Sequence, residues 1–119
     1  MTPQLVYAFD PLCGWCYGFG PAFRAVRAAL PDLAIELRFG GLVTGGRIGP
    51  YADKRAYIEA AQVRLRAVTG LAPGPEFHAR ILQDPSVIAS SIPPCDVLLQ
   101  LRRVVPGAVP DFAEAIQTA

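Results

Sequence analysis

The segment DPLCGWCYGFGP, Asp10 to Pro21, decides how the fold of this chain is interpreted. It places two cysteines three positions apart, Cys13 and Cys16, between a short apolar run and a stretch that predicts a helix. Such a pair is typical of a redox dithiol, of half a metal site, or of a nucleophile beside a structural thiol. The flanking residues are needed to distinguish among these three kinds of site.

The flanking residues predict a strand, a helix and a second strand. Gln4 to Phe9 is an apolar run ended by Asp10-Pro11, as in a short buried strand. Cys13 to Leu30 predicts a helix, and Leu33 to Phe39 alternates apolar and polar residues as a strand does. Strand, helix and strand within about 35 residues favour a right-handed parallel crossover.

The rest of the chain predicts a loop followed by helices. The glycine-rich segment from Gly40 to Pro50 lacks the Gly-Lys-Ser/Thr of a phosphate-binding loop, so it does not indicate a nucleotide site. Several prolines stand where the first turn of a helix accepts them. The expected helices are Ala52–Thr69, Pro75–Gln83, Pro94–Val105 and Pro110–Thr118.

Composition predicts a folded chain of 119 residues, with 52% apolar and 18% charged residues. A net charge of +1 implies no broad attraction to nucleic acid or anionic lipid. No apolar stretch has the length of a membrane span, and the N-terminus does not resemble a signal peptide. Because three cysteines fit intracellular chemistry better than a secreted disulfide framework, we expect a cytoplasmic protein.

The spacing of Cys13 and Cys16 suits thiol–disulfide exchange. Cys13 is expected at the start of a helix, where unpaired backbone N–H groups and the helix dipole favour a thiolate. Cys16 is then one turn further along on the same face, with Cβ atoms roughly 5 to 6 Å apart. A small adjustment brings such a pair within the range of a disulfide bond.

The segment Asp10 to Pro21 resembles the active-site segment of the DsbA-like, thioredoxin-fold oxidoreductases, in particular the cytoplasmic branch described as predicted protein-disulfide isomerases. The sequence GGLVTG from Gly40 and the sequence SIPPCDVLLQLRR from Ser91 are also similar to that branch. The resemblance implies an α/β, thioredoxin-like (DsbA-like) β-α-β unit followed by a helical insertion. It implies one partial domain, 1–119, divided into a β-α-β half at 4–39 and an insertion at 51–119.

The resemblance also implies the chemistry of the chain. Cys13 is expected to be the nucleophile and Cys16 the resolving thiol of an oxidoreductase or isomerase. The substrate would be a disulfide-bearing protein or a small thiol such as glutathione, without a metal, a nucleotide, nucleic acid or a membrane. The family continues with a β-hairpin, a closing helix and a cis-proline loop that faces the cysteines. This sequence lacks them, and Pro93 and Pro94 are only weak substitutes because they precede a helix.

Two parallel strands are too few for a stable sheet, so the chain is expected to be a truncated product or a fragment. One alternative is therefore a non-catalytic product that folds only by swapping or pairing, as a homo-oligomer or with a missing C-terminal half. It predicts exposed apolar surface where further strands would pack. A glutathione-transferase-like relative of the same fold is a third alternative, although serine typically replaces the first cysteine there.

Other residues leave narrower alternatives open. Asp10 either accepts the proton of Cys16 or forms the turn before the helix. Zinc could be held by both cysteines of the motif with Cys95 and His78, but the latter two lack paired spacing. Cys13 to Tyr17 also approaches a papain-like signature, yet no histidine and asparagine follow at the distance that such a protease needs.

Two further predictions concern packing. Cys95 is expected to pack at the start of a helix, whose N-terminus could also lower its pKa. Four apolar residues recur at helical spacing in the first helix and are expected in the core rather than in a ligand site. They are Phe19, Phe23, Val26 and Leu30.

Overall fold

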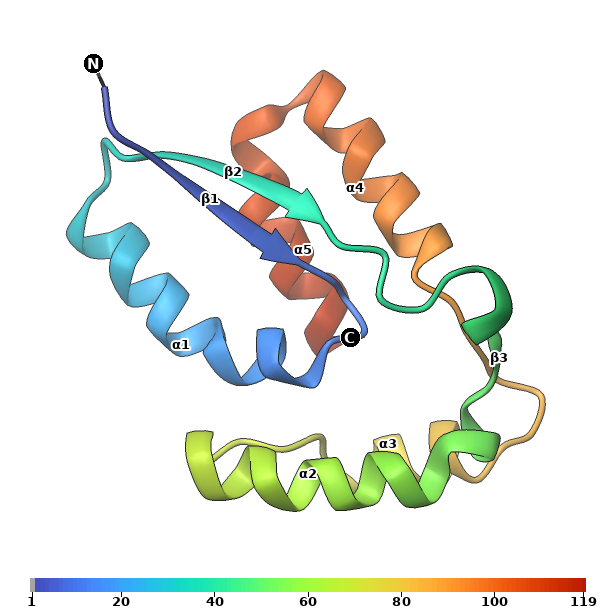
Figure 1. Cartoon of the computed structure of the whole chain (residues 1–119). Coiled ribbons are helices and arrows are strands. Elements are labelled where there is room, and N and C mark those ends of the chain that lie inside the picture. Colours follow the sequence, from blue (N-terminus) through green and yellow to red (C-terminus); the bar gives the residue numbers. More distant parts are fainter. Residues whose placement is uncertain (1) are drawn as a thin grey trace.

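The structure is a computed structural model that describes residues 2–119, and it begins with the predicted β-α-β unit (Figure 1). Strand β1 (Gln4–Phe9), helix α1 (Gly14–Ala29) and strand β2 (Ala34–Phe39) lie within one residue of the expected bounds. The two strands are parallel, with Gln4 opposite Ala34 and Phe9 opposite Phe39. The strand-helix-strand prediction is therefore confirmed.

The alternation of side chains along the strands gives the sheet one covered face. On β1, Tyr7 and Phe9 point into the molecule, whereas Val6 points to the opposite face and is 51% exposed. On β2, Leu37 is buried and Arg38 is exposed. The period of two thus places one row of apolar side chains against the helices.

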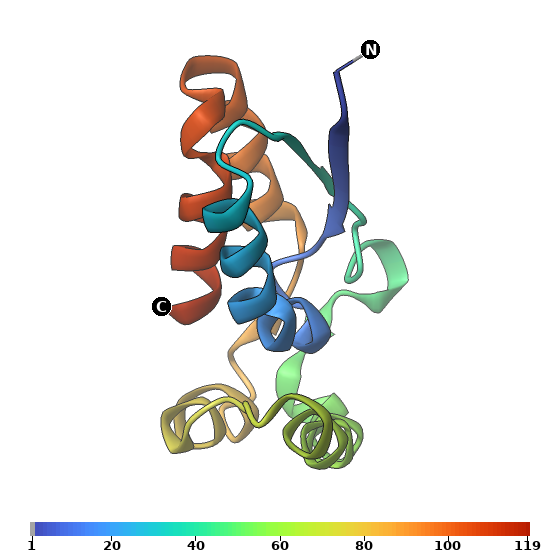
Figure 2. The same cartoon turned by 90° about the vertical axis from the view of Figure 1, so that its left-hand side faces the viewer.

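Helices α4 (Ile92–Val104) and α5 (Val109–Thr118) complete this layer, with the short helix η4 (Pro106–Ala108) between them. Figure 2 shows α1, α4 and α5 on the same side of the two strands. Arg24 of α1 forms an ion pair with Glu114 of α5, and Arg102 donates a hydrogen bond to the Leu37 carbonyl at 2.9 Å. The buried core consists of Phe9, Phe23, Leu37, Leu98, Val109 and Ala113.

We call residues 2–39 and 92–119 the body, and the helical segment 51–82 the arm. The arm contains η2 (Tyr51–Lys54), α2 (Arg55–Thr69), α3 (Pro75–Phe77) and a turn of π-helix, η3 (His78–Leu82). Gly70 ends α2 in the left-handed conformation at φ 74°, which glycine adopts without strain. Figure 1 shows the arm lying apart from the sheet, below the body.

The connection between body and arm differs from the prediction of a plain loop at Gly40 to Pro50. It contains η1 (Gly45–Arg47) and the two-residue strand β3 (Gly49–Pro50), which pairs antiparallel with β4 (Ile88–Ala89). The pairing could not be seen locally because its partner lies about 40 residues further along the chain. Among residues 2–119, no helix is both long and apolar enough to cross a membrane.

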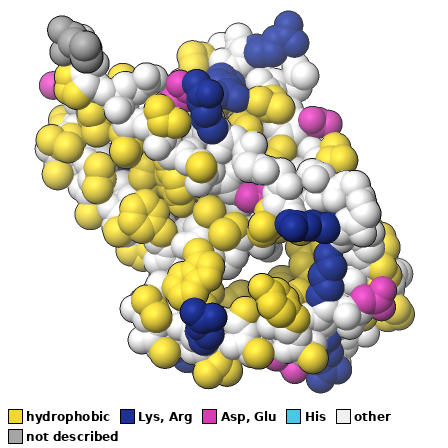
Figure 3. Space-filling model, in the orientation of Figure 1, with side chains coloured by type: hydrophobic (Ala, Val, Ile, Leu, Met, Phe, Trp, Pro, Cys, Tyr) yellow, Lys and Arg dark blue, Asp and Glu magenta, His cyan; other side chains and the backbone are white. Residues whose placement is uncertain are grey.

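The predicted core of α1 is only partly correct. Phe23 is buried, but Phe19 is 46% exposed and Leu30 is 53% exposed. A two-stranded sheet is too narrow to cover the full apolar stripe of a sixteen-residue helix, so its flank and its C-terminal end stay open. Figure 3 shows hydrophobic side chains gathered over α1 on the face seen there.

Candidate active site

The two cysteines of the motif lie where β1 gives way to α1. A turn follows the strand, and the Cys13 N–H donates to the Asp10 carbonyl at 3.0 Å. Cys13 is the N-cap of α1 with extended backbone angles, and Cys16 follows in the first turn. Both side chains are half-buried, and neither is in a disulfide bond. The sequence prediction of a cysteine pair at a helix start is confirmed.

The environment of Cys13 favours its thiolate. A hydrogen bond from the Cys16 thiol is the largest of the effects that lower the pKa of Cys13 to about 6. The backbone N–H groups of Trp15 and Cys16 act in the same direction, while partial burial and the charge of Asp10 oppose it. The backbone contribution is that of an N-cap position, since the first N–H groups of a helix have no partner within the helix.

Cys16 responds in the opposite direction. Its pKa is raised well above the ordinary value because its proton is held in the hydrogen bond to Cys13 and because burial disfavours its charge. The Tyr7 hydroxyl and the Asp10 backbone act against this increase. At neutral pH, the pair therefore holds one proton, which lies on Cys16, and one negative charge, which lies on Cys13.

Asp10 forms the turn before the helix. It is 4% exposed, and its Oδ1 accepts hydrogen bonds from the Leu12 N–H at 2.9 Å and from the Ser91 hydroxyl at 3.0 Å. Its Oδ2 accepts from the Leu42 N–H at 2.9 Å. One carboxylate thus joins the end of β1, the loop after β2 and the start of α4. The turn role is confirmed, and the proton-acceptor role stays a prediction.

A cleft opens in front of Cys13, between the start of α1 and the arm. Its volume is about 460 Å³, and Figure 3 shows the hollow between body and arm. The described residues that line it include no Asp, Glu, Lys, Arg or His. Gln62 lines this cleft, and its buried amide Nε2 has no hydrogen-bond partner among the described residues. The aromatic part of the lining comprises Trp15, Tyr17, Tyr51, Tyr57 and Phe77.

Sequence reasoning missed Tyr7 and Gln62 as site residues. Tyr7 could have been predicted to face the interior, because it alternates with Phe9 on the same side of β1. It also stands only six residues before Cys13. Gln62 carried no such signal, since a glutamine within a helix is ordinarily solvent-exposed. Its position beside the cleft depends on how the arm packs.

The remaining sequence candidates lie elsewhere. His78 of the arm is 3.8 Å from Glu59, and no group of three or more His, Cys, Asp or Glu in residues 2–119 is placed to hold a metal ion. Pro93 and Pro94 lie in the first turn of α4, and the described residues contain no cis peptide bond.

Cys95 is buried at the start of α4, as expected. However, burial, together with the charges of Asp10 and Asp96, raises its pKa to about 11. The pKa of Cys95 is thus raised and not lowered at this helix start, and loss of solvent is the largest cause.

Two solved structures are similar to almost the whole chain. One is described as a candidate protein disulfide isomerase from Nitrosomonas europaea, with 27% identity and a TM-score of 0.74 over 98% of this chain and 54% of that chain. The other is the cytosolic disulfide reductase DsbM from Pseudomonas aeruginosa with GSH, with 28% identity and a TM-score of 0.74 over 96% of this chain and 53% of that chain.

The chain thus spans about half the length of the two solved structures that it matches. No protein-family model and no curated protein sequence matches it.

Proposed function

Because the chain has the DsbA-like thioredoxin fold of these disulfide oxidoreductases, we propose that it carries out thiol–disulfide exchange, with Cys13 as nucleophile and Cys16 as resolving thiol. The observation that carries the proposal is the opposite displacement of the two pKa values at a helix start. A thiolate at neutral pH and a protonated neighbour in hydrogen-bond contact are what the two steps of exchange require.

The reaction proceeds in two balanced steps. The Cys13 thiolate attacks one sulfur of a substrate disulfide, forms a mixed disulfide and releases the other sulfur as a thiolate, which takes a proton from solvent. Cys16 then loses its proton to solvent and attacks Cys13 Sγ. The bond between Cys13 and the substrate breaks, its electron pair leaves with the substrate sulfur, and the enzyme pair becomes a disulfide. The reverse order oxidises a substrate dithiol, and both together permit isomerisation.

The substrate we propose is a disulfide-bearing protein or glutathione. The cleft beside Cys13 is large enough for several residues of a peptide, and its aromatic lining suits apolar side chains. The similar DsbM structure contains GSH and is described as cytosolic, which supports a small-thiol substrate and a cytoplasmic location for this chain. No group in this mechanism requires a metal or a nucleotide.

The pH dependence of Cys13 alkylation tests the proposal. Iodoacetamide labelling followed by site assignment with mass spectrometry should give a midpoint near pH 6 for Cys13, with labelling rising as pH increases through that value. Cys95, whose pKa is about 11, is an internal control that should label only at much higher pH.

Two variants refine this test. Cys16→Ala removes the thiol that donates to Cys13 and should shift the midpoint upward, towards the ordinary thiol value near 8.5. Cys16→Ser keeps a donor and should shift it less. An ordinary midpoint for Cys13 in the unaltered chain, with equal labelling of all three cysteines, would reject the exchange function.

A second candidate is a non-catalytic chain that folds as a paired assembly. It is favoured by one observation: within residues 2–119, β1 and β2 pair only with each other, and Val6 on the outer face is half-exposed. Analytical ultracentrifugation separates the two candidates when combined with alkylation. A stable dimer with an ordinary Cys13 midpoint supports the second, whereas a midpoint near pH 6 supports the first in either assembly state.

A further inference from the structure

Tyr7 is held beside the resolving thiol by an aromatic cluster. Its ring lies 4.8 Å from the ring of Phe23, 5.5 Å from that of Phe19 and 5.8 Å from that of Phe9, measured between centroids. All three contacts are edge-to-face or close to it, which is the favourable arrangement of aromatic pairs. The position of the ring, and so the direction of its hydroxyl, is fixed by packing.

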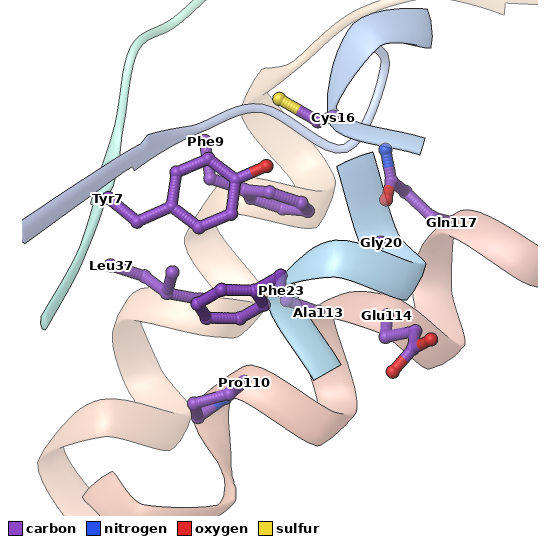
Figure 4. Close-up of a pocket in the computed structure, with 10 residues that line it drawn as sticks. All are labelled: Tyr7, Phe9, Cys16, Gly20, Phe23, Leu37, Pro110, Ala113, Glu114 and Gln117. Carbon is purple, nitrogen blue, oxygen red and sulfur yellow. The ribbon is translucent and has the colours of Figure 1, made fainter. Parts of the chain in front are cut away.

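The hydroxyl end of Tyr7 lies at a small cavity behind the cysteine pair. The cavity has a volume of about 20 Å³, and its lining includes Tyr7, Cys16 and, from α5, Glu114 and Gln117. Figure 4 shows the Tyr7 hydroxyl directed to the side of the cavity where Cys16 lies, above the ring of Phe23. The Tyr7 ring and the Cys16 side chain thus line the same small space, with the hydroxyl on the side of the sulfur.

We propose that Tyr7 donates a hydrogen bond to the sulfur of Cys16 and thereby stabilises the Cys16 thiolate that attacks the mixed disulfide. This role rests on the proposed exchange function, because it concerns the second of its two steps. It adds a third residue to the reacting pair, contributed by β1 rather than by the helix that carries both cysteines.

The hydroxyl acts as a donor and not as a base. Burial, and next the hydrogen bond with Cys16, raise the pKa of Tyr7 well above its ordinary value, so the phenol keeps its proton throughout. In the resolution step, Cys16 releases its proton to solvent, the S–S bond to Cys13 forms and the bond from Cys13 to the substrate breaks. The Tyr7 O–H stabilises the negative charge on Cys16 before that charge is lost in the new bond.

Other ionisable groups near Cys16 determine the charge that surrounds its sulfur. Cys13 carries the negative charge of the reduced pair, and Asp10, directly after the strand that carries Tyr7, adds a second negative charge near Cys13. From α5, Glu114 lines the cavity but is paired with Arg24 of α1. The described residues that line the cavity with Cys16 include no Lys, Arg or His, and the side-chain N–H donor among them, the Gln117 amide, already donates to the Cys13 carbonyl. The Tyr7 hydroxyl is therefore the neutral donor available to a Cys16 thiolate.

The test uses Tyr7→Phe, which keeps the ring in the cluster and removes only the hydroxyl. The matched control is Ser86→Ala, which removes a hydroxyl from an exposed turn outside the linings of both the cleft and the cavity. Cys95→Ala is present in both variants and in the reference protein, so that only Cys13 and Cys16 can react. Each reduced protein is mixed with one equivalent of dithiobis-nitrobenzoate. Attack by Cys13 releases a first nitrothiobenzoate, and attack by Cys16 on the resulting mixed disulfide releases a second.

We expect Tyr7→Phe to slow the second release about tenfold or more, the effect of losing one hydrogen bond to a charged group. The pH midpoint of the second release should rise by about one unit, which a purely structural change would not produce. The first release should change much less, and Ser86→Ala should change neither.

Each result decides the matter. An unchanged second release with an unchanged pH midpoint in Tyr7→Phe overturns the role of Tyr7. Equal slowing of both releases also overturns it, because the hydroxyl would then support the whole site rather than the resolving thiol. Absence of a fast first release in the unaltered chain rejects the exchange function itself, which separates that failure from failure of the role proposed for Tyr7.

Discussion

The body and the arm are held together in different ways. The body packs side chains from both ends of the chain into one apolar cluster, in which Phe23, Leu37 and Leu98 are buried. The arm buries little of its own: Leu65 and Leu82 are covered, while Tyr57 and Val63 stand largely exposed on α2. This difference indicates that packing in the body fixes the geometry of the two thiols. The arm forms one side of the cleft, and only a few contacts fix its position.

Two features place the arm on the body. The first is the carboxylate of Asp10, which holds the connecting segments on both sides of the arm, at Leu42 and at Ser91, to the end of β1. The second is the crossing of α1 and α2, where Gly18 faces Leu65 and Thr69. If this comparison is right, substitutions in the core, at the junction and at the crossing should have effects that decrease in that order.

The largest effect is expected from the core. Leu98 in the body and Leu82 in the arm are both 0% exposed, so Leu98→Ala and Leu82→Ala delete the same atoms from equally buried sites. Leu98→Ala should lower the free energy of unfolding by about 2 to 5 kcal/mol and abolish the Cys13 midpoint near pH 6. Leu82→Ala should disorder the arm and leave that midpoint in place. Urea unfolding measures the change in stability, and alkylation measures the Cys13 midpoint. Equal shifts of the Cys13 midpoint in the two variants would contradict the distinction between body and arm.

An intermediate effect is expected at the junction. Asp10→Ala leaves the N–H groups of Leu12 and Leu42 and the hydroxyl of Ser91 without their acceptor, at a cost of about 1 to 3 kcal/mol. The exposed Asp32→Ala is the control and should change stability little. Chemical denaturation monitored by circular dichroism gives the comparison. A cost at Asp10 no greater than that at Asp32 would show that Asp10 does not hold the connecting segments to the body.

The same position can also be tested for proton transfer. Asp10→Asn keeps an oxygen acceptor and removes the charge. If its exchange rates match those of the unaltered chain across pH, Asp10 does not accept the proton of Cys16.

The smallest effect is expected at the helix crossing. A Cβ added at Gly18 would lie 2.8 Å from the Leu65 Cδ1 and 2.8 Å from the Thr69 Cγ2, so either these side chains or α2 must shift. Gly18→Ala should cost about 1 kcal/mol, since the obstructing atoms are side-chain ends. Gly20→Ala, also in α1, meets only the Arg24 guanidinium at 3.7 Å and should be neutral or stabilising. Hydrogen exchange in α2 should increase in the first variant only. Matched exchange in both would mean that the arm does not depend on this close approach.

Much of the body could be predicted from sequence because its signals are local. The strand bounds follow from apolar runs ended by Asp10-Pro11 and from the alternation in β2, and the bounds of α1 follow within one residue. The position of Cys13 at a helix start required no more than the motif and the helix behind it. The resemblance to DsbA-like oxidoreductases is confirmed by the two solved structures.

What could not be predicted depends on contacts between distant segments. Sequence alone does not indicate that α4 and α5 pack on the sheet while α2 stays with the arm, since all three helices are amphipathic. The exposure of Phe19 and Leu30 follows from the width of the sheet, which no local pattern encodes. The raised pKa of Cys95 likewise depends on burial by other elements rather than on its place in a helix.

The Gln117 side chain of α5 donates a hydrogen bond at 3.2 Å to the carbonyl of Cys13, across 104 positions of sequence. During synthesis at about 5 to 20 residues per second, Cys13 would leave the ribosome about 5 to 20 seconds before its partner on α5. Throughout that interval, α5 cannot cover the face of the sheet behind the cysteines. The thiols therefore gain the cover that α5 supplies only after this interval, and until then the nascent chain presents them without that cover to the oxidants and reductants around it.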